Sequence, residues 1–579
     1  MKKLISSIMV TCLTIAALSG CSPAAQAPAQ SEAPVQTSAP APATSTAPAT
    51  STAPAAPAAP VAEEQVFNTV LAAEPMSLDI GRSSDTYGST IIINTYDALT
   101  RSIKKDGVFE LTPAGAKTWT SNADGTVWTF ELNENTWSDG VPVTAHDYEY
   151  GIKRMVDPDT GAPLSHFLAP IKNFEACNSG DMPIDELGVT ATDDHTLVIE
   201  LGAPTPYFLS LTYNRVMSPQ RQDLVELHGD KFGSEAEYTI SCGPFILTSW
   251  VHNTKIELVK NEYYWDKDNV KLDKINMAII ADETTRLNAF DAGEIDYVST
   301  AKKEFVQKFQ DKGNATYLKY PSATLTYSFF NTEDDIFSNA NIRKAFMLGI
   351  DREEINELCF DGMRIPTYGW VVPTISAGSL NYREQAGDLI LEMAKTEPSP
   401  QELLLKGMEE LGLGDDPTTL NVVFSLAGTD TWFRTLGEYL QQAYKETLGI
   451  NLEISFSEWS IFIDNVHKGN YQIGFMGWGA SYNDPNDVLA LHTASANALY
   501  TGWTNPEYDA LIAKAASELD NQKRIDIYIE AEKLLIVENA VANPLATSSV
   551  SEFYRDYVQG DYSETFTTMG FKYLYISGK

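Results

Sequence analysis

Cysteine and histidine are scarce in this 579-residue chain, which has five cysteines and seven histidines. No two cysteines have Cys-x-x-Cys spacing, no two histidines lie four residues apart, and no histidine is grouped with a cysteine. Structural zinc sites need such clusters, so we expect no bound metal. Beyond the N-terminal segment only Cys177, Cys242 and Cys359 occur. They allow at most one disulfide, and we expect ordinary buried thiols.

Basic residues are also few, with 41 Lys and Arg against 78 Asp and Glu, a formal charge of −37. This charge disfavours nucleic acid and anionic lipid as partners. The chain lacks a Walker A loop, HExxH, GxSxG and a dinucleotide glycine fingerprint. The sequence therefore indicates neither an enzyme nor a cofactor.

The N-terminus has the features of an export signal. Lys2 and Lys3 precede a short, mostly apolar run from Leu4 to Leu18, and Leu18-Ser19-Gly20-Cys21 forms a lipobox. The apolar run is too short to span a bilayer, and no later stretch is long and apolar enough to do so. We expect residues 1–20 to be a lipoprotein signal peptide and Cys21 to carry the lipid that holds the protein on a membrane surface.

A low-complexity segment follows the lipobox. Every residue from Thr37 to Pro60 is Ala, Pro, Ser or Thr. Such a composition cannot offset the entropy of ordering, and its prolines favour extended polyproline II. At roughly 3 Å per residue, residues 21–63 are predicted to form a disordered stalk that reaches on the order of 100 Å.

Strand and helix patterns alternate through the rest of the chain. Strands are predicted at Val66–Leu71, Trp128–Leu132, Asp194–Leu201 and Lys255–Val259, and one amphipathic helix over Asn341–Leu358. Thr144 and Asp147 have the spacing of a helix capping box. A clear alternation runs from residue 421 to residue 476, with a helix over Thr431–Leu448. The alternation predicts α/β lobes with largely parallel sheets.

Asp484 and Asp487 are the best acidic pair in the chain. Two carboxylates across a scissile bond would suit a glycosidase. A structural interpretation fits better, with Asp484 as helix N-cap, Pro485 in the first turn and Asp487 in the favourable N-terminal turn.

Several motifs, in the same order along the chain, resemble family 5 of the extracytoplasmic solute-binding proteins, which serve oligopeptide and dipeptide ABC transporters. The resemblance covers the chain from about Glu74 to Ile576. The motifs are Glu74-Pro-Met-Ser-Leu-Asp79, Trp137-Ser-Asp-Gly-Val-Pro-Val-Thr-Ala-His-Asp147, Lys260-Asn-Glu-Tyr-Tyr-Trp265, Gly293-Glu-Ile-Asp-Tyr297 and Asn341-Ile-Arg-Lys-Ala-Phe-Met-Leu-Gly-Ile-Asp-Arg352.

The resemblance implies an α/β protein with a two-lobed periplasmic-binding-protein type II fold and an additional domain, three domains in all. Lobe I would comprise residues 64–98, 222–320 and 546–579, domain II residues 99–221, and lobe III residues 321–545. A hinge near Pro321 and Leu545 would let the lobes close on a ligand. The expected partners are a peptide, a membrane permease with its ATPases, and the membrane through the lipid anchor; a monomer on the outer face of the cytoplasmic membrane is expected.

The resemblance also implies where a ligand would bind. An extended peptide would pair its backbone with strands of the cleft, and hydrated pockets would accept varied side chains. Ser84-Asp85-Thr86 falls where the family has a strand that contacts the ligand backbone. Gly477-Trp478-Gly479 matches the strand that pairs with the peptide. The remaining expected ligand-binding residues are Trp432, Phe433, Trp459, Ser481, Tyr482 and Asn497.

Departures from the family pattern leave the ligand open. Peptide binders usually have Asp at the position of Ser481, where it holds the peptide's α-ammonium group. Val466 and Phe475 stand where arginines would meet a carboxylate, Leu164 replaces a cleft tyrosine, and Cys242 replaces an asparagine. A buried ammonium without a counter-charge is costly, so the anchors of a short zwitterionic peptide are not evident.

Three ligand classes remain from the sequence. A longer or blocked peptide could bind through its backbone alone, and Asp85 could supply the missing negative charge. An oligosaccharide would suit the tryptophans and neutral groups such as Ser481 and Asn497. A metal chelate fits least, because histidines are not clustered. A surface chaperone, a pheromone sensor and, more remotely, a secreted hydrolase are further alternatives.

Overall fold

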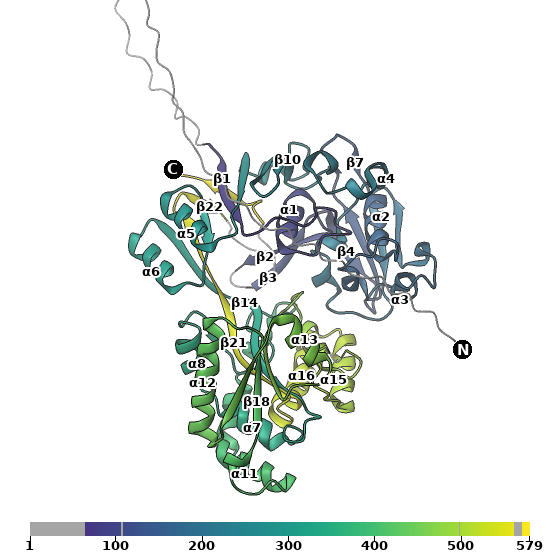
Figure 1. Ribbon diagram of the computed structural model, residues 1–579. Helices are drawn as coiled ribbons and strands as arrows, with labels where there is room; N and C mark the ends of the chain where they lie inside the picture. The colour runs from purple at the N-terminus through teal and green to yellow at the C-terminus, as the bar shows by residue number, and fades with distance from the viewer. Residues whose placement is uncertain (1–63, 106–107, 497, 561–569) are drawn as a thin grey trace, which may run out of the picture. The chain divides into compact units, whose positions relative to one another are not determined.

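The computed structural model describes residues 64–105, 108–496, 498–560 and 570–579 (Figure 1). The signal peptide, Cys21, the stalk and Asn497 lie outside the described residues. Among the residues described, no helix has the length and apolar character needed to span a membrane.

A four-stranded sheet joins the start of the described chain to its middle. Its order is β1-β12-β11-β10, with β1 and β12 parallel and the other pairs antiparallel. Alternate residues of β1 are buried, which explains why its bounds match the prediction. The strands are β1 (Val66–Leu71), β10 (Phe245–Val251), β11 (Lys255–Lys260) and β12 (Lys274–Ile279).

A second four-stranded sheet, of order β4-β5-β9-β8, is antiparallel throughout. Helix α2 (Ala145–Val156) packs against β8 and β9. The predicted capping box is confirmed, because the Thr144 side chain accepts from the N3 backbone and Asp147 accepts from the Thr144 N–H at 2.8 Å. The strands are β4 (Ala116–Ser121), β5 (Val127–Leu132), β8 (Val189–Asp193) and β9 (Thr196–Glu200).

The largest sheet has the order β13-β21-β14-β20-β18-β19, with β15 paired to β21. Only the β18–β19 and β18–β20 pairs are parallel, so the prediction of largely parallel sheets is wrong. The long strands β14 and β21, which come from distant parts of the chain, add antiparallel pairs. The strands are β13 (Tyr297–Ser299), β14 (Ala315–Phe330), β15 (Ile365–Pro366), β18 (Val422–Leu426), β19 (Leu452–Phe456), β20 (Ile473–Gly479) and β21 (Ala542–Arg555).

Helices cover both faces of this sheet, with α8 and α12 on one side and α15 and α16 on the other (Figure 1). Phe424 of β18 and Phe475 of β20 pack in a hydrophobic cluster on the face that α8 and α12 cover. Leu325 and Tyr327 of β14 pack in a second cluster, on the face that α15 and α16 cover. The first face is covered by α7 (Ala340–Leu348), α8 (Arg352–Cys359), α11 (Pro400–Leu411) and α12 (Thr431–Leu448). The second is covered by α10 (Leu389–Thr396), α13 (Trp459–His467), α15 (Pro506–Ser517) and α16 (Asn521–Glu532).

The single helix predicted over residues 341–358 is wrong, because the chain breaks there into α7 and α8. Helix α7 ends at the cap residue Gly349, and Asp351 begins α8 by accepting the backbone N–H groups of Glu353 and Glu354 at 2.9 and 3.0 Å. A capping aspartate interrupts the helical pattern although the apolar spacing continues.

The pair β14 and β21 contains an irregularity close to the predicted hinge. Pro321 pairs with Ser549, the next paired residues are Leu325 and Thr547, and the register shifts between them. On one side of the shift Phe553 packs with a cluster from residues 287–309; on the other side the strands lie in the core of the large sheet.

Shorter elements complete the described chain. The helices are α1 (Thr86–Thr95), α3 (Phe174–Asn178), α4 (Gln222–His228), α5 (Glu283–Ala292), α6 (Lys303–Lys312), α9 (Tyr382–Ala386) and α14 (Pro485–Leu489). The strands are β2 (Thr100–Lys105), β3 (Val108–Pro113), β6 (Asn135–Thr136), β7 (Pro142–Val143), β16 (Ser376–Ala377), β17 (Leu380–Asn381), β22 (Val558–Gly560) and β23 (Leu574–Ile576).

Candidate functional site

Strand β20 has an open backbone edge at its C-terminal end. It pairs with β14 over its whole length, from Ile473 to Gly479. On its other side, pairing with β18 ends where Leu426 meets Phe475. Within the described residues no strand pairs with Met476–Gly479 on that side. An extended chain could add there, because unpaired N–H and C=O groups are a template for another strand.

The two glycines of this segment leave space beside the open edge. A Cβ on Gly477 would come no closer than 3.5 Å to another atom, and one on Gly479 no closer than 3.4 Å. The protein's own packing does not require glycine at these positions. Trp478 between them packs partly buried against the core. Their small size leaves room for a second backbone to approach.

A cavity of about 250 Å³ contains the segment Ser84-Asp85-Thr86. The prediction of a strand there is wrong, since Asp85 is the N-cap of α1 and accepts the Gly88 N–H at 2.7 Å. Thr86 is the first helical residue. The three residues still line this cavity, and Ser481 lines it as well. Leu164, which occupies the position of a tyrosine in the family pattern, also lines it.

Arg215 lines the same cavity. It was not predicted as a site residue, because nothing in the sequence distinguishes it from the other arginines. It is 5 % exposed, and it donates to the backbone and side-chain oxygens of Ser83 at 2.9 and 3.0 Å. Burial lowers the pKa of Arg215 to about 10, partly opposed by Asp85, so the guanidinium stays charged at neutral pH. The cavity therefore holds a buried cation.

A neighbouring cavity of about 470 Å³ shares Phe167 and Ser481 with the first. Tyr207 and Tyr482 stack in its wall, with ring centroids 5.3 Å apart and planes 17° apart. Asp487 also lines it, and accepts the backbone N–H of Ser481 at 2.6 Å. The full lining is His166, Phe167, Ala169, Pro170, Gly202, Ala203, Thr205, Tyr207, Leu211, Ser481, Tyr482 and Asp487.

Burial raises the pKa of Asp487 to about 7, because desolvation outweighs the backbone hydrogen bonds from Ser481 and Tyr482. The charge of Asp484 adds to this increase. The sequence indicated a capping-turn position for Asp487, and it does lie in the first turn of α14. Only the structure shows that its side chain borders a cavity.

Asp484 has the structural role predicted for it. It is the N-cap of α14, accepts the Asn486 N–H at 3.0 Å and is followed by Pro485 in the first turn. Its two oxygens also accept from Arg524 at 2.8 and 2.9 Å, and both side chains are buried. Both carboxylate oxygens of Asp484 are thus engaged in structural contacts.

The other predicted aromatic residues do not line these two cavities. Trp432 donates from its indole N–H to the Cys359 carbonyl at 2.7 Å and packs edge-on against Phe433, with ring centroids 4.6 Å apart. Trp459 is 54 % exposed at the start of α13, where its ring stacks on Phe462. Asn497 lies outside the described residues.

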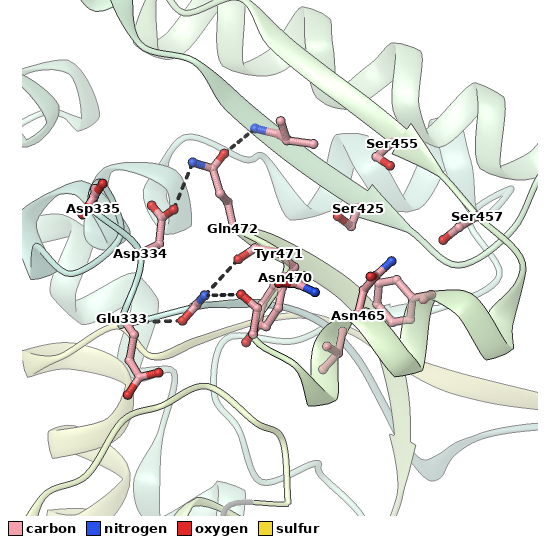
Figure 2. A pocket seen from close by; sticks show the side chains of 15 residues that line it. Glu333, Asp334, Asp335, Ser425, Ser455, Ser457, Asn465, Asn470, Tyr471 and Gln472 are labelled. Atoms are coloured by element: carbon pink, nitrogen blue, oxygen red, sulfur yellow. Dashed lines mark hydrogen bonds between the residues drawn. The ribbon is translucent and has the colours of Figure 1, made fainter. Parts of the chain in front are cut away.

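A polar cavity of about 510 Å³ lies at the opposite end of β20 (Figure 2). The amide of Gln472 accepts the Val423 N–H at 2.7 Å and donates to Asp334 at 3.1 Å. Asn331 donates to the carbonyls of Gly469 and Tyr471. The hydrogen bonds of Gln472 and Asn331 hold the surrounding chain together. None of the predicted ligand-binding residues that the structure describes lines this cavity.

The three cysteines of the described chain are all free and buried, as expected. Burial raises the pKa of each thiol. No group of three or more His, Cys, Asp or Glu residues within the described ranges could hold a metal ion.

A mixed sheet with an open strand edge beside two cavities is the arrangement of a solute-binding protein. The sequence pattern of the family described as "Bacterial extracellular solute-binding proteins, family 5 Middle" matches residues 110–500. The chain belongs to this family, and its fold is the two-lobed type II fold of periplasmic binding proteins.

Several similar proteins carry names that refer to peptide binding. The chain is 34 % identical over 479 residues to the oligopeptide-binding protein OppA of Bacillus subtilis (strain 168), covering 82 % of this chain and 86 % of that protein. It resembles the unliganded open form of the murein tripeptide binding protein MppA with a TM-score of 0.75 and 27 % identity, covering 89 % and 98 %. OppA of Haemophilus influenzae in complex with RPPGFSPFR gives a TM-score of 0.70 and 26 % identity, covering 89 % and 99 %.

Proposed function

We propose that this protein is the substrate-binding lipoprotein of an ABC importer and that it captures peptides. The open edge of β20 at Met476–Gly479 carries the proposal, because an extended peptide can pair with it through main-chain hydrogen bonds. Main-chain hydrogen bonds do not depend on the peptide's side chains, so this pairing suits a protein that binds varied peptides. Relatives named as oligopeptide-binding proteins support the same conclusion.

The two cavities next to this edge would receive parts of the ligand. Ser481 and Tyr482 follow the open segment after Ala480, and Ser481 lines both cavities. We propose that they form the binding site together with Ser84, Asp85 and Thr86. Trp432, Phe433, Trp459 and Asn497 remain predicted contacts for more distant parts of a ligand.

Closure of the site would use the long strands β14 and β21. The register shift between Pro321 and Leu325 supports a hinge there, since a bulge interrupts the ladder and eases local bending. We propose the three-domain division of residues 64–98, 222–320 and 546–579 (lobe I), 99–221 (domain II) and 321–545 (lobe III).

The N-terminal features would place the protein beside its transporter. After removal of residues 1–20, Cys21 would be lipidated and residues 21–63 would tether the monomeric receptor to the outer face of the cytoplasmic membrane. A permease pair with ATPases would accept the released peptide. The charge of −37 supports the absence of nucleic acid among its partners.

Ester-substituted peptides test backbone pairing directly. An ester in place of an amide removes one N–H donor without changing the side chains. Because an extended peptide directs alternate residues to the edge of β20, esters at alternate positions should weaken binding by about 3- to 10-fold, and those between them much less. Calorimetric titration with the tetrapeptide Ala-Ala-Ala-Ala and its ester series would measure this. Equal losses at every position would contradict strand addition.

Native mass spectrometry of the purified protein tests the ligand class. Retained peptides are expected, and a peptide that binds should raise the melting temperature by mass action. Recovery of hexose oligomers would instead show an oligosaccharide binder. The bound peptide should be recovered unchanged after prolonged incubation, since the proposal includes no chemical step.

A further inference from the structure

The cavity that contains Asp487 has an unusual charge arrangement. Asp487 is its only acidic lining residue, and the charged side chain that acts on it most is another carboxylate, that of Asp484. Arg524 is already engaged by both oxygens of Asp484. In the described part of the chain no basic side chain pairs with Asp487. A buried carboxylate without a basic partner is costly to ionise, and a cation bound beside it would stabilise its charge.

The rest of the cavity wall suits the apolar surroundings of a cationic group. Tyr207 and Tyr482 stack against each other, and Phe167 packs against His166 with ring centroids 4.5 Å apart. Aromatic faces attract cations, and their apolar bodies strengthen a nearby ion pair by excluding water. The pKa of His166 is lowered by burial, so this ring is neutral at pH 7 and does not compete for Asp487.

The position of Asp487 relative to the open strand edge is fixed. The 2.6 Å hydrogen bond from the Ser481 N–H holds one carboxylate oxygen two residues beyond Gly479, where the open segment of β20 ends. A peptide that pairs with this segment would therefore reach the Asp487 cavity with one end or one side chain.

We propose that Asp487 is the ammonium-binding residue of this site and that the cavity takes the amino group of the bound peptide. The proposal rests on the proposed function. Asp487 would supply, from six positions further along the chain, the negative charge that Ser481 does not. The ammonium could come from the peptide's N-terminus or from a lysine side chain, and both would make the same charge-assisted hydrogen bond.

Asp487→Asn is the primary variant, because asparagine keeps the acceptor for the Ser481 N–H and removes the charge. Wild-type protein should bind Ala-Ala-Ala-Ala about 10- to 100-fold more tightly than its N-acetylated form, the loss expected for one hydrogen bond to a charged group. The variant should bind both forms equally, because the two changes remove the same contact. Asp416→Asn, an exposed helix cap remote from the cavities, is the charge-matched control and should keep the full discrimination.

Two further peptides separate the sources of the ammonium. If a lysine side chain occupies the cavity, N-acetyl-Lys-Ala-Ala-Ala should regain the tight binding that N-acetyl-Ala-Ala-Ala-Ala lacks, and only in wild-type protein. If the cavity takes the N-terminus, the acetylated lysine peptide should bind as weakly as the acetylated alanine peptide. Both results support the proposal if Asp487→Asn loses the tight binding of the peptide that carries the ammonium group.

The pH dependence gives an independent measurement. With a pKa of about 7 for the free carboxyl, Asp487 gains its charge between pH 6 and pH 7.5, so affinity for an ammonium should rise roughly 5- to 10-fold over this interval. Affinity of Asp487→Asn should stay flat. The titratable and charged groups that face Asp487 are Asp484 with its partner Arg524, Tyr207, Tyr213, Tyr482 and His166. The tyrosines have raised pKa values and stay neutral throughout.

Two outcomes would overturn the proposal while leaving peptide binding intact. One is tight binding of free and acetylated peptides alike by the wild-type protein. The other is loss of discrimination in Asp85→Asn with full discrimination in Asp487→Asn, which would make Asp85 the anchor. Failure of the wild-type protein to bind any of these peptides would instead contradict the proposed function itself. Melting curves of each variant confirm that the comparison is made between folded proteins.

Discussion

Arg524 and Asp484 form a fully buried ion pair, in which one guanidinium nitrogen donates to both carboxylate oxygens at 2.8 and 2.9 Å. The pair links α16 to the N-terminus of α14, directly after the segment that borders both cavities. Asp484, which a glycosidase interpretation would make catalytic, therefore has a structural role. Its ion pair with Arg524 holds the segment that carries Ser481 and Asp487 in place.

Arg524→Ala should destabilise the protein by about 3–5 kcal/mol, because it leaves the Asp484 carboxylate buried without its partner. Chemical denaturation would measure the loss. Lys468→Ala is a suitable comparison: its 2.6 Å pair with Asp464 is 59 % exposed on both sides, so roughly 0.5 kcal/mol or less is expected. A small effect of Arg524→Ala would mean that water reaches Asp484.

Asp487→Asn should stabilise the protein at alkaline pH. The folded-state pKa of Asp487, about 7, lies above the ordinary value of 3.8, so the folded protein binds more protons than the unfolded chain between these pH values. Stability therefore falls as pH rises from about 4 to about 7. Removing the charge should recover roughly 1–3 kcal/mol at pH 8 and little at pH 4.

Unfolding curves at both pH values would test this expectation. An equal change in stability at pH 4 and pH 8 would show that ionisation of Asp487 is not responsible. A gain in stability combined with a loss of ammonium binding would be the usual exchange between stability and function at a binding site.

Asp351→Ala should cost about 1 kcal/mol, because α8 loses the acceptor for the Glu353 and Glu354 N–H groups in its first turn. Asp415 is exposed and precedes the cap residue Asp416 without being a cap itself, so Asp415→Ala should change stability by less than about 0.5 kcal/mol. Equal effects of the two variants, measured by urea unfolding, would contradict the capping role that divides α7 from α8.

The three buried thiols should resist alkylation in the folded protein. Their pKa values are raised by burial, and the reactive thiolate is scarce as well as shielded. Iodoacetamide at pH 8 should label Cys177, Cys242 and Cys359 only after urea is added, as mass spectrometry of digested protein would show. Rapid labelling of any of them without urea would reveal local opening at that site.

The local spacing of apolar and capping residues was sufficient to predict a helix or strand wherever one face of that element is buried. The strand Val66–Leu71 and the helix Thr431–Leu448 have the predicted bounds, and the capping roles of Thr144 and Asp484 are confirmed. The family motifs, which are short and contiguous, were also readable without a structure. Local pattern failed where a polar cap overrides apolar spacing, as at Asp351, and where a loop rather than a strand presents Asp85.

By itself the sequence determined the family, the alternation of helices and strands, and the unusual Ser481 at the expected ammonium-binding position. Only the tertiary structure decided that β14 and β21 make the large sheet mixed, that pairing of β18 with β20 stops at Phe475, and that Asp487 lies in a cavity. That cavity joins residues 166–211 to residues 481–487. Contacts between such distant segments depend on how complete elements pack, and no local spacing of residues specifies that packing.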